Sequence, residues 1–297
     1  MELRNVISFL RVVELENFTK AAQELGYTQS TVTFQIQQLE RELGAPLLDR
    51  VGKTVSLTPL GEQFLGYATQ LVQLNEQIQN LGRPASQIRG TLRVGILESL
   101  FTWIFARQFP AYHERFPLVQ VETKIASGEE LLEMLRRNEL DIVFLLDWDL
   151  AGHRCTQALT HPEPIVFVCR PDHPLAGRRG LSLSEVLAQP LILTERKSVY
   201  RRALAEVAAQ QGLPLRPTLE VNHTNIIVEL VQRGLGISLL PAYTVRRQLA
   251  AGELCQLEVS DFSLTLWSQI FYHRNKWVTP QMTGFIQVIQ EFFQETT

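Results

Sequence analysis

The 297-residue sequence has no long apolar run, few cysteines and no excess of charge of one sign. No stretch of about 18 apolar residues occurs, so neither a transmembrane helix nor a membrane partner is predicted. At the N-terminus, Leu3, Ile7, Leu10 and Val13 share one face of an amphipathic helix, which lacks the uninterrupted apolar core of a signal peptide. We therefore expect a cytoplasmic protein.

The scarcity of reactive groups argues against an enzyme. Cys155, Cys169 and Cys255 are far apart and odd in number, with neither a disulfide framework nor metal-ligand spacing. Cys169 lies in a strand pattern and reads as a small core residue. The Gly-x-Ser-x-Gly, His-Glu-x-x-His, P-loop and dinucleotide-binding glycine motifs are absent. We predict no catalytic residue, no metal and no cofactor.

The charge balance excludes a strongly basic nucleic-acid binder. The net charge is −3, and residues 1–58 hold six Lys and Arg against seven Asp and Glu. DNA binding would therefore depend on which face carries the cations, and on several copies acting on one DNA. The length and the apolar content of 45% predict two or three domains with substantial cores.

Residues 17–42 carry the strongest pattern, two short helices joined by a tight turn. Asn17 is a suitable cap for a helix that runs to Leu25, and Gly26 suits a turn with positive φ. Thr28 is a suitable cap for the second helix. This arrangement is typical of a helix-turn-helix, in which the second helix reads DNA.

The second helix has a buried face and an uncharged polar face. Val32, Ile36 and Leu39 recur at helical spacing and predict the buried side. The polar face carries Gln29, Ser30, Thr33, Gln37 and Gln38. Amides and hydroxyls suit base edges and phosphates, whereas a solvated helix is normally rich in Lys and Glu. The alternative is a plain helical hairpin with a solvated polar face.

A wing is predicted next, with strands at 47–50 and 54–57 around Val51-Gly52-Lys53. Arg50 at its base and Lys53 at its tip suit phosphate or minor-groove contact; the alternative is a solvated hairpin tip. Thr58 and Pro59 then open a helix over 58–81, because Thr caps helices and Pro suits their first position.

That long helix has a single narrow apolar seam. Its members alternate at spacings of four and three, and they are Leu60, Phe64, Tyr67, Leu71, Leu74, Ile78 and Leu81. Such a seam needs a partner helix, so we predict dimerisation through it; packing on its own domain is the alternative. The expected domains are 1–58 for DNA binding, 59–89 for the linker helix and hinge, and 90–297 for ligand binding.

After residue 90 the pattern changes to strands alternating with helices, which predicts an α/β domain. We expect two lobes, with 90–160 and 266–297 in lobe I and 161–265 in lobe II. Ligands in open α/β sheets bind beyond the carboxyl ends of strands, where helix N-termini point. Four such junctions converge if the lobes face each other, and they contain Glu98, Ser99, Leu100, Ser127, Gly128, Thr194, Ser198, Asn222 and Thr224.

These loops favour a small anionic ligand, although each polar residue can also be read as a plain helix cap. Glu98 disturbs the anion interpretation. Its carboxylate would repel an anion unless it pairs with Arg196, with Lys197 or with an amine on the ligand. A zwitterion would satisfy both conditions.

The motifs resemble those of LysR-type transcriptional regulators over the whole chain. The matching pieces are Phe18-Thr19-Lys20-Ala21-Ala22, Gln29, Gln35-Ile36, Leu39-Glu40, Leu43-Gly44, Leu47-Leu48-Asp49-Arg50 and Leu57-Thr58-Pro59-Leu60-Gly61-Glu62. The resemblance implies a winged helix-turn-helix, a dimerising linker helix, and a two-lobed α/β domain similar to periplasmic solute-binding proteins. It also implies double-stranded DNA, a small-molecule effector and other copies of the chain, as dimer and tetramer, as partners, and it admits RNA polymerase.

Carried over by position, the expected DNA contacts are Lys20, Thr28, Gln29, Ser30, Thr31, Thr33, Gln35, Gln38, Arg50 and Lys53. Two positions depart from the family pattern, since Ser30 stands where Pro is frequent and Phe34 where a basic residue is frequent. Phe34 cannot make a cation's phosphate contact, and it is expected to pack against sugar or a thymine methyl, or to be half buried. The alternative function is a solute-binding or enzymatic α/β protein with an incidental helical N-terminus, which would be a monomer without DNA affinity.

Overall fold

The computed structural model describes residues 1–51, 54–148, 155–274, 276 and 278–296. Its contacts divide the chain into two compact units. The N-terminal unit consists of Met1–Thr91 with the short segments Leu118–Gln120 and Arg136–Glu139. The second unit contains Leu92–Pro117, Val121–Leu135 and Leu140–Thr297.

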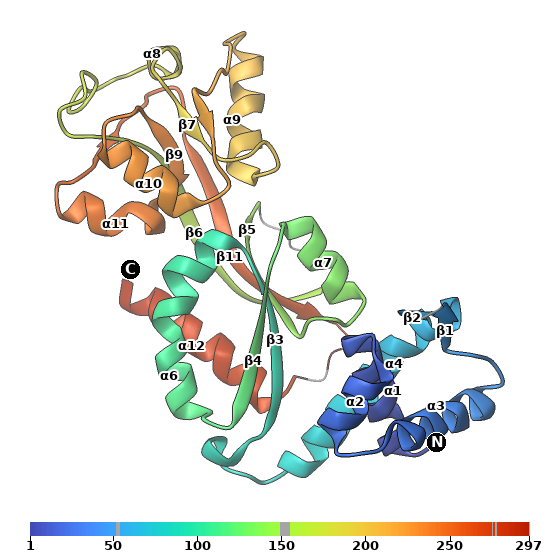
Figure 1. Cartoon of the computed structure of the whole chain (residues 1–297). Helices are drawn as coiled ribbons and strands as arrows, with labels where there is room; N and C mark the ends of the chain where they lie inside the picture. The colour runs from blue at the N-terminus through green and yellow to red at the C-terminus, as the bar shows by residue number, and fades with distance from the viewer. Residues whose placement is uncertain (52–53, 149–154, 275, 277, 297) are drawn as a thin grey trace. The chain divides into compact units, whose positions relative to one another are not determined.

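The N-terminal unit is a three-helix winged helix-turn-helix followed by a long helix (Figure 1). Its elements are α1 (Leu3–Leu15), α2 (Phe18–Leu25), α3 (Gln29–Leu43), β1 (Leu48–Val51), β2 (Thr54–Leu57), α4 (Pro59–Asn80) and the 3₁₀ turn η1 (Ala85–Gln87). Strands β1 and β2 pair antiparallel, with Leu48 opposite Leu57. The predicted helix-turn-helix, wing strands and long helix are therefore confirmed.

Local side chains fix the ends of these helices as expected. The Asn17 side chain accepts hydrogen bonds from the backbone N–H groups of Thr19 and Lys20. Gly26 has φ of 70°, which only glycine adopts without a Cβ penalty, and this ends α2. Thr58 Oγ1 accepts from the N–H of Gly61 at 2.9 Å and opens α4.

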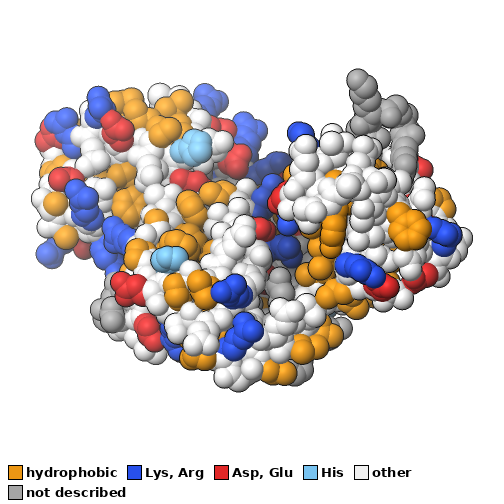
Figure 2. Space-filling view, turned by 60° about the horizontal axis from the view of Figure 1, so that its bottom comes forward, with side chains coloured by type: hydrophobic (Ala, Val, Ile, Leu, Met, Phe, Trp, Pro, Cys, Tyr) orange, Lys and Arg blue, Asp and Glu red, His pale blue; other side chains and the backbone are white. Residues whose placement is uncertain are grey.

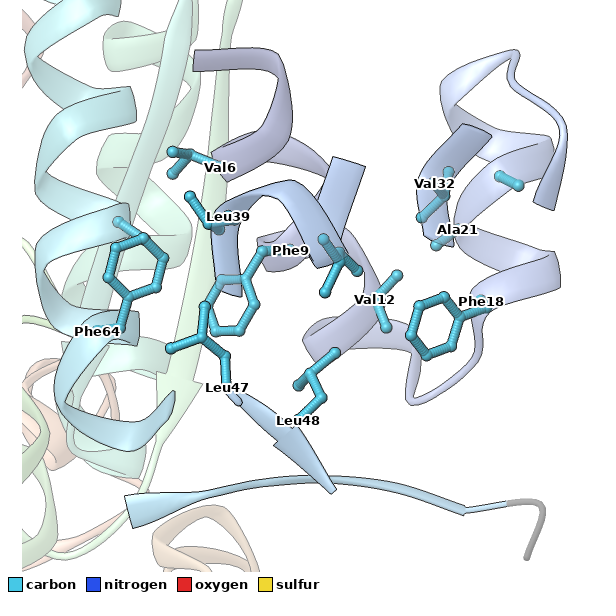
Figure 3. Close-up of a cluster of buried hydrophobic side chains, with 13 residues drawn as sticks. Val6, Phe9, Val12, Phe18, Ala21, Val32, Leu39, Leu47, Leu48 and Phe64 are labelled. Atoms are coloured by element: carbon cyan, nitrogen blue, oxygen red, sulfur yellow. The ribbon is translucent and has the colours of Figure 1, made fainter. Parts of the chain in front are cut away.

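One apolar core holds the three helices, the wing and the start of α4 together (Figure 3). The rings of Phe9 and Phe64 meet edge to face, with centroids 5.2 Å apart. Val32 and Leu39 of α3 are fully buried in the same core, so the opposite face of α3 turns away from it. The reading helix is thereby fixed in orientation by its own buried stripe.

The second unit is built on a seven-stranded sheet with helices on both sides. Its elements are β3 (Gly90–Ile96), α5 (Glu98–Leu100), the π-helical segment η2 (Phe101–Phe105), α6 (Ala106–Arg115), β4 (Val119–Ile125), α7 (Gly128–Arg136), β5 (Ile142–Asp147), β6 (Cys155–Cys169), α8 (Leu183–Leu187), β7 (Ile192–Leu193), α9 (Val199–Gln210), β8 (Leu219–Glu220), α10 (Thr224–Gln232), β9 (Ser238–Pro241), α11 (Ala242–Ala250), β10 (Cys255–Leu257), β11 (Leu264–His273) and α12 (Pro280–Thr296). The predicted fold class, a helix-turn-helix followed by an α/β domain, is confirmed.

Strand order in the sheet is β10-β6-β11-β5-β3-β4, and β9 pairs with β6. The long strands β6 and β11 are antiparallel and run through both lobes. The expected lobe boundaries at 160/161 and 265/266 therefore fall inside continuous strands. Lobe II adds β9 and β10 to β6, and it has a small parallel sheet of β7 and β8.

Helices cover both faces of the sheet around β5 (Figure 1). Val143 and Leu145 pack with α7, while Phe144 meets Phe293 of α12 edge to face. Helices α6 and α12 lie side by side on that second face. No helix among the described residues is both long enough and apolar enough to cross a membrane.

Candidate DNA interface and effector pocket

The exposed face of α3 carries the side chains expected to read DNA. Gln29 and Ser30 are exposed in its first turn, and Thr31, Thr33 and Gln38 are partly exposed. The stretch from Thr28 to Leu39 presents no charge to solvent. A helix end with free N–H groups and uncharged polar side chains suits phosphate oxygens and base edges.

The hydroxyl groups at the start of α3 form a small cluster. Thr28 Oγ1 lies 2.8 Å from both Ser30 Oγ and Thr31 Oγ1, and it also accepts from the Thr31 N–H at 3.2 Å. Thr28 is thus both the predicted cap and the centre of the cluster. Exposed hydroxyls can rotate toward a phosphate without unfolding the helix.

Phe34 is exposed rather than packed into its domain. Its exposed fraction is 58%, and the Arg41 guanidinium lies over its ring at 5.7 Å from the centroid. An apolar ring flanked by a cation therefore stands among the uncharged polar residues of α3. A DNA contact of Phe34 with sugar or with a thymine methyl stays a prediction.

Gln35 is a correction to the predicted DNA contacts. It is only 6% exposed, and its Oε1 accepts a hydrogen bond of 2.6 Å from the Ser8 hydroxyl of α1. The side chain therefore joins two helices inside the unit and does not reach a phosphate. Position 35 lies one residue before buried Ile36, at the edge of the core stripe, which explains the misreading.

Cations on this unit are few. Lys20 is exposed on α2, as expected for a phosphate contact. Arg50 belongs to β1, but its side chain and all of Lys53 lie outside the described residues. On the face that Figure 2 shows, Lys and Arg side chains lie interspersed with Asp and Glu side chains, in keeping with the small net charge.

The seam of α4 is buried only at its beginning. Phe64 joins the helix-turn-helix core, and Leu60 is partly buried against it. Farther along, Tyr67, Leu74 and Ile78 are 71%, 52% and 60% exposed. Packing on its own domain thus accounts for the first turns only, and the rest of the seam has the form of a helix-pairing surface.

A cavity of about 320 Å³ lies in the second unit at the carboxyl ends of the strands. This volume suits a small molecule. The structure brings eight of the nine predicted effector residues to its wall, namely Glu98, Ser99, Ser127, Gly128, Thr194, Ser198, Asn222 and Thr224. Leu100 is the exception and a correction, because its side chain is fully buried in the core.

The interpretation of these residues as plain helix caps holds for one of them. Ser127 and Glu130 form the predicted capping box of α7, with Ser127 Oγ 3.0 Å from the Glu130 carboxylate. Ser198 precedes α9, yet its side chain makes no cap hydrogen bond. Ser99 Oγ lies 2.8 Å from the Tyr243 hydroxyl, a bond between the two lobes.

Glu98 also joins the two lobes. One carboxylate oxygen accepts from the N–H of Thr224, the first residue of α10, at 3.3 Å, and the other accepts from the Thr102 hydroxyl at 3.4 Å. Arg196, an expected partner, instead lies 3.7 Å from Glu220. The carboxylate thus occupies the positive end of a helix dipole, where an anion would otherwise bind.

Several pocket residues were not predicted, among them Asp147 and Tyr200. Asp147 ends β5, so the strand-end rule applied to every strand would have found it. Tyr200 is buried beside Thr194, Ser198 and Thr224, and burial raises its pKa. No group of three or more His, Cys, Asp or Glu side chains with the arrangement of a metal site occurs in the described part of the chain.

A helix-turn-helix with an uncharged reading face, joined to a two-lobed domain around a small-molecule cavity, defines a ligand-responsive transcriptional regulator. Residues 3–62 match the family "Bacterial regulatory helix-turn-helix protein, lysR family", and residues 85–294 match the LysR substrate binding domain. The chain belongs to the LysR family of transcriptional regulators, which are not enzymes. The expected resemblance is confirmed, and the N-terminal helices are not incidental.

Individual relatives agree over the full length. The HTH-type transcriptional regulator YwqM of Bacillus subtilis is 32% identical over 99% of this chain and 100% of its own. Full-length OxyR of Pseudomonas aeruginosa shares the fold, with a TM-score of 0.75 at 21% identity over 99% of this chain and 95% of that one. Full-length CbnR, solved with its target DNA, has a TM-score of 0.63 at 20% identity over 98% and 99% of the two chains.

Proposed function

We propose that this protein binds an operator in double-stranded DNA as a dimer or tetramer and that a small effector in the cavity switches it. The observation that carries the proposal is the exposed, uncharged polar face of α3, held outward by a capped and buried helix-turn-helix. CbnR, of the same fold, has been solved with its target DNA. Residues 1–58 would bind DNA, 59–89 would link protomers, and 90–297 would bind the effector.

Within the DNA-binding domain, Gln29 and Ser30, which are exposed in the first turn of α3, would contact base edges. Thr28, Thr31, Thr33 and Gln38 would contact phosphates or nearby groups, together with Lys20 of α2. Arg50 and Lys53 would add backbone or minor-groove contacts from the wing. Because so few cations are available, a single copy would bind weakly, and the exposed α4 seam supplies the second copy.

Switching would follow from differential affinity of the effector for two arrangements of the lobes. Both Ser99–Tyr243 and Glu98–Thr224 join lobe I to lobe II beside the cavity. A ligand that replaces or strengthens these bonds would change the lobe arrangement and, through α4, the spacing of paired DNA-binding domains. The cytoplasm, with RNA polymerase bound nearby, is the expected setting.

The test is a salt titration of binding to the DNA upstream of the protein's own gene, with random DNA of equal length as competitor. Light scattering on the same samples gives the oligomeric state. We expect a dimer or tetramer that prefers the upstream DNA and weakens steeply as salt rises. A monomer that does not distinguish the two DNAs at low salt would contradict the proposal.

The Gln29→Ala variant tests base reading directly. Loss of a bidentate amide contact should cost about 1–3 kcal/mol on the operator and relax the preference at one base pair. Gln210→Ala, at the exposed end of α9, is the matched control and should bind as the wild type does. Equal losses on operator and random DNA would show that Gln29 does not read a base.

A further inference from the structure

The effector cavity, whose role rests on the function proposed above, has both carboxylates and donor hydroxyls on its wall. The carboxylates include those of Glu98 and Asp147. Glu98 accepts one hydrogen bond at each carboxylate oxygen, from Thr224 N–H and from the Thr102 hydroxyl. An ionised carboxylate has about four acceptor positions, so Glu98 keeps capacity for a cationic donor.

The wall at Glu98 is closed to an anion. The amino end of α10 already faces the Glu98 carboxylate, so its N–H groups and dipole are compensated from within the protein. A ligand carboxylate placed there would have to displace Glu98 and would then lie close to it. A ligand ammonium group would instead meet Glu98 with favourable charge.

The wall beside α9 offers hydroxyl donors. The Thr194 and Ser198 hydroxyl oxygens are buried, and neither has a hydrogen-bond partner among the residues that the structure describes. The Tyr200 phenol lies beside both hydroxyls, but neither pair meets the geometry of a hydrogen bond. Thr194, which is 6% exposed, and Ser198 line the cavity together with Glu195 and Lys197.

The helix that starts here is also free at its amino end. Helix α9 is 12 residues long, and Ser198 at its cap position gives no side-chain bond to it. By contrast, α7 is closed by its capping box, and the Ser99 hydroxyl is bonded to Tyr243. Among the described helices that begin at the cavity, α9 thus combines free N–H groups with unpaired buried hydroxyls, which suits a carboxylate.

We propose that the effector is a zwitterion of the α-amino-acid class. Its ammonium group binds Glu98, and its carboxylate binds Thr194, Ser198 and the first N–H groups of α9. The side chain of the ligand lies against the apolar wall formed by Ile125, Leu145 and Val199. Binding would bridge lobe I, which carries Glu98, and lobe II, which carries α9.

The experiment is calorimetric titration of the full-length protein with each of the twenty common amino acids. Each is compared with its deaminated carboxylate and its decarboxylated amine. We expect an amino acid to bind, and removal of either charged group to weaken binding at least tenfold. If a carboxylate or an amine alone binds as tightly as the matching amino acid, or if no compound binds, the inference is overturned.

Variants identify the two ends. Glu98→Gln keeps the size and an acceptor for Thr224, so it should fold, yet it should bind the amino acid at least tenfold more weakly. Thr194→Val should cause a similar loss by removing a hydroxyl at the carboxylate end. Glu206→Gln, exposed on α9, is the charge-matched control and should bind like the wild type. Unchanged affinity in the Glu98 variant would refute the ammonium contact.

DNA binding by the same samples separates the two proposals. If a carboxylate that carries no amine alters operator binding, the proposal of an effector-switched regulator stands and the proposal of a zwitterionic effector is overturned. Loss of specific DNA binding in every sample would contradict the regulator itself. Thermal unfolding without ligand shows whether each variant is folded before its affinity is interpreted.

Discussion

Phe34 is a solvent-exposed aromatic residue on a helix face that otherwise carries amides and hydroxyls. An exposed ring gains nothing from the protein core, and Arg41 covers only one side of it. The thymine C5-methyl group is the apolar feature of the major groove, and an aromatic side chain can contact it. A contact between Phe34 and DNA therefore stays a prediction.

Replacement of thymine by uracil in the operator tests this contact, because it removes only the methyl group. At the contacted position we expect affinity to fall by roughly 0.8 kcal/mol, the value of one buried methylene. Phe34→Ala should bind both DNAs equally, and the control Gln37→Ala should keep the difference. If Phe34→Ala remains sensitive to uracil, another residue contacts that methyl.

Gln35 contributes to stability rather than to recognition. Gln35→Ala removes the acceptor of the buried Ser8 hydroxyl, so the free energy of unfolding of the N-terminal unit should fall by about 1–3 kcal/mol. Hydrogen exchange of the α1 and α3 amides measures this, with exposed Gln37→Ala as control. The affinity of the folded variant for DNA at fixed salt should stay unchanged, and a loss of affinity in folded protein would mean that Gln35 contacts DNA after all.

For single residues, the sequence predicted correctly those hydrogen bonds whose two partners are close in the chain. The caps Asn17, Thr28 and Thr58 were predicted because their partners lie two or three residues away. Prediction failed for Gln35 because the partner, Ser8, is 27 residues earlier in the chain. The hydrogen bond of Ser99 to Tyr243 was missed for the same reason, since 144 residues separate them.

Among the elements, α4 has a surface that its own unit leaves uncovered. Beyond Phe64, the seam residues Tyr67, Leu71, Leu74 and Ile78 are exposed, at heptad spacing. An apolar seam of this length on an isolated helix is unfavourable in water, so pairing with a second copy is the expected state.

Leu74→Glu tests this pairing. In a two-fold dimer the change removes two buried leucines, each worth about 1.5–3 kcal/mol, and the dimer should dissociate roughly a hundredfold more readily or more. Sedimentation equilibrium measures the constant. Gln79→Glu adds the same charge off the seam and should leave the dimer intact. A Leu74→Glu protein that remains fully dimeric would place the interface elsewhere.

Two strands, β6 and β11, cross the lobe boundaries that the sequence indicated. Prolines 162 and 164 interrupt the β6 pattern, and because proline cannot donate to a strand ladder, the segment reads as a break. The structure keeps the strand continuous, with Pro162 opposite Trp267 and Pro164 opposite Thr265 of β11. The strand stays continuous because it pairs with β11, which is about a hundred residues away in the chain. No local sequence pattern indicates this pairing.

For the molecule as a whole, β6 carries a buried carboxyl group through the centre of the ligand-binding unit. Glu163 is 1% exposed, and its Oε1 accepts from the N–H of Tyr243 at 3.0 Å near the start of α11. Burial raises the pKa of Glu163 to about 7, although that hydrogen bond and nearby Arg246 act in the opposite direction. The Tyr243 hydroxyl in turn forms a hydrogen bond with the Ser99 hydroxyl in the other lobe. Glu163 therefore contacts a residue that joins the two lobes.

The raised pKa fixes the sign of a pH effect on stability. Between about pH 4.5 and 7 the folded protein keeps the Glu163 proton while the unfolded chain loses it, so stability falls as pH rises through this window and is level above it. The difference corresponds to roughly 3 kcal/mol. Glu163→Gln retains an acceptor without the charge, and it should remove this fall.

Urea unfolding at pH 5, 6, 7 and 8, followed by tryptophan fluorescence, measures the effect in the right unit, since all four tryptophans lie after residue 90. His161 has a pKa lowered by burial and by Arg246, but it is present in both proteins and cancels in the comparison. We expect the variant and the wild type to be similar at pH 5 and the variant to be more stable at pH 8. Exposed Glu206→Gln should follow the wild type throughout. A variant that is less stable than the wild type at pH 8 would show that the ionised carboxylate is stabilised inside the fold, contrary to this prediction.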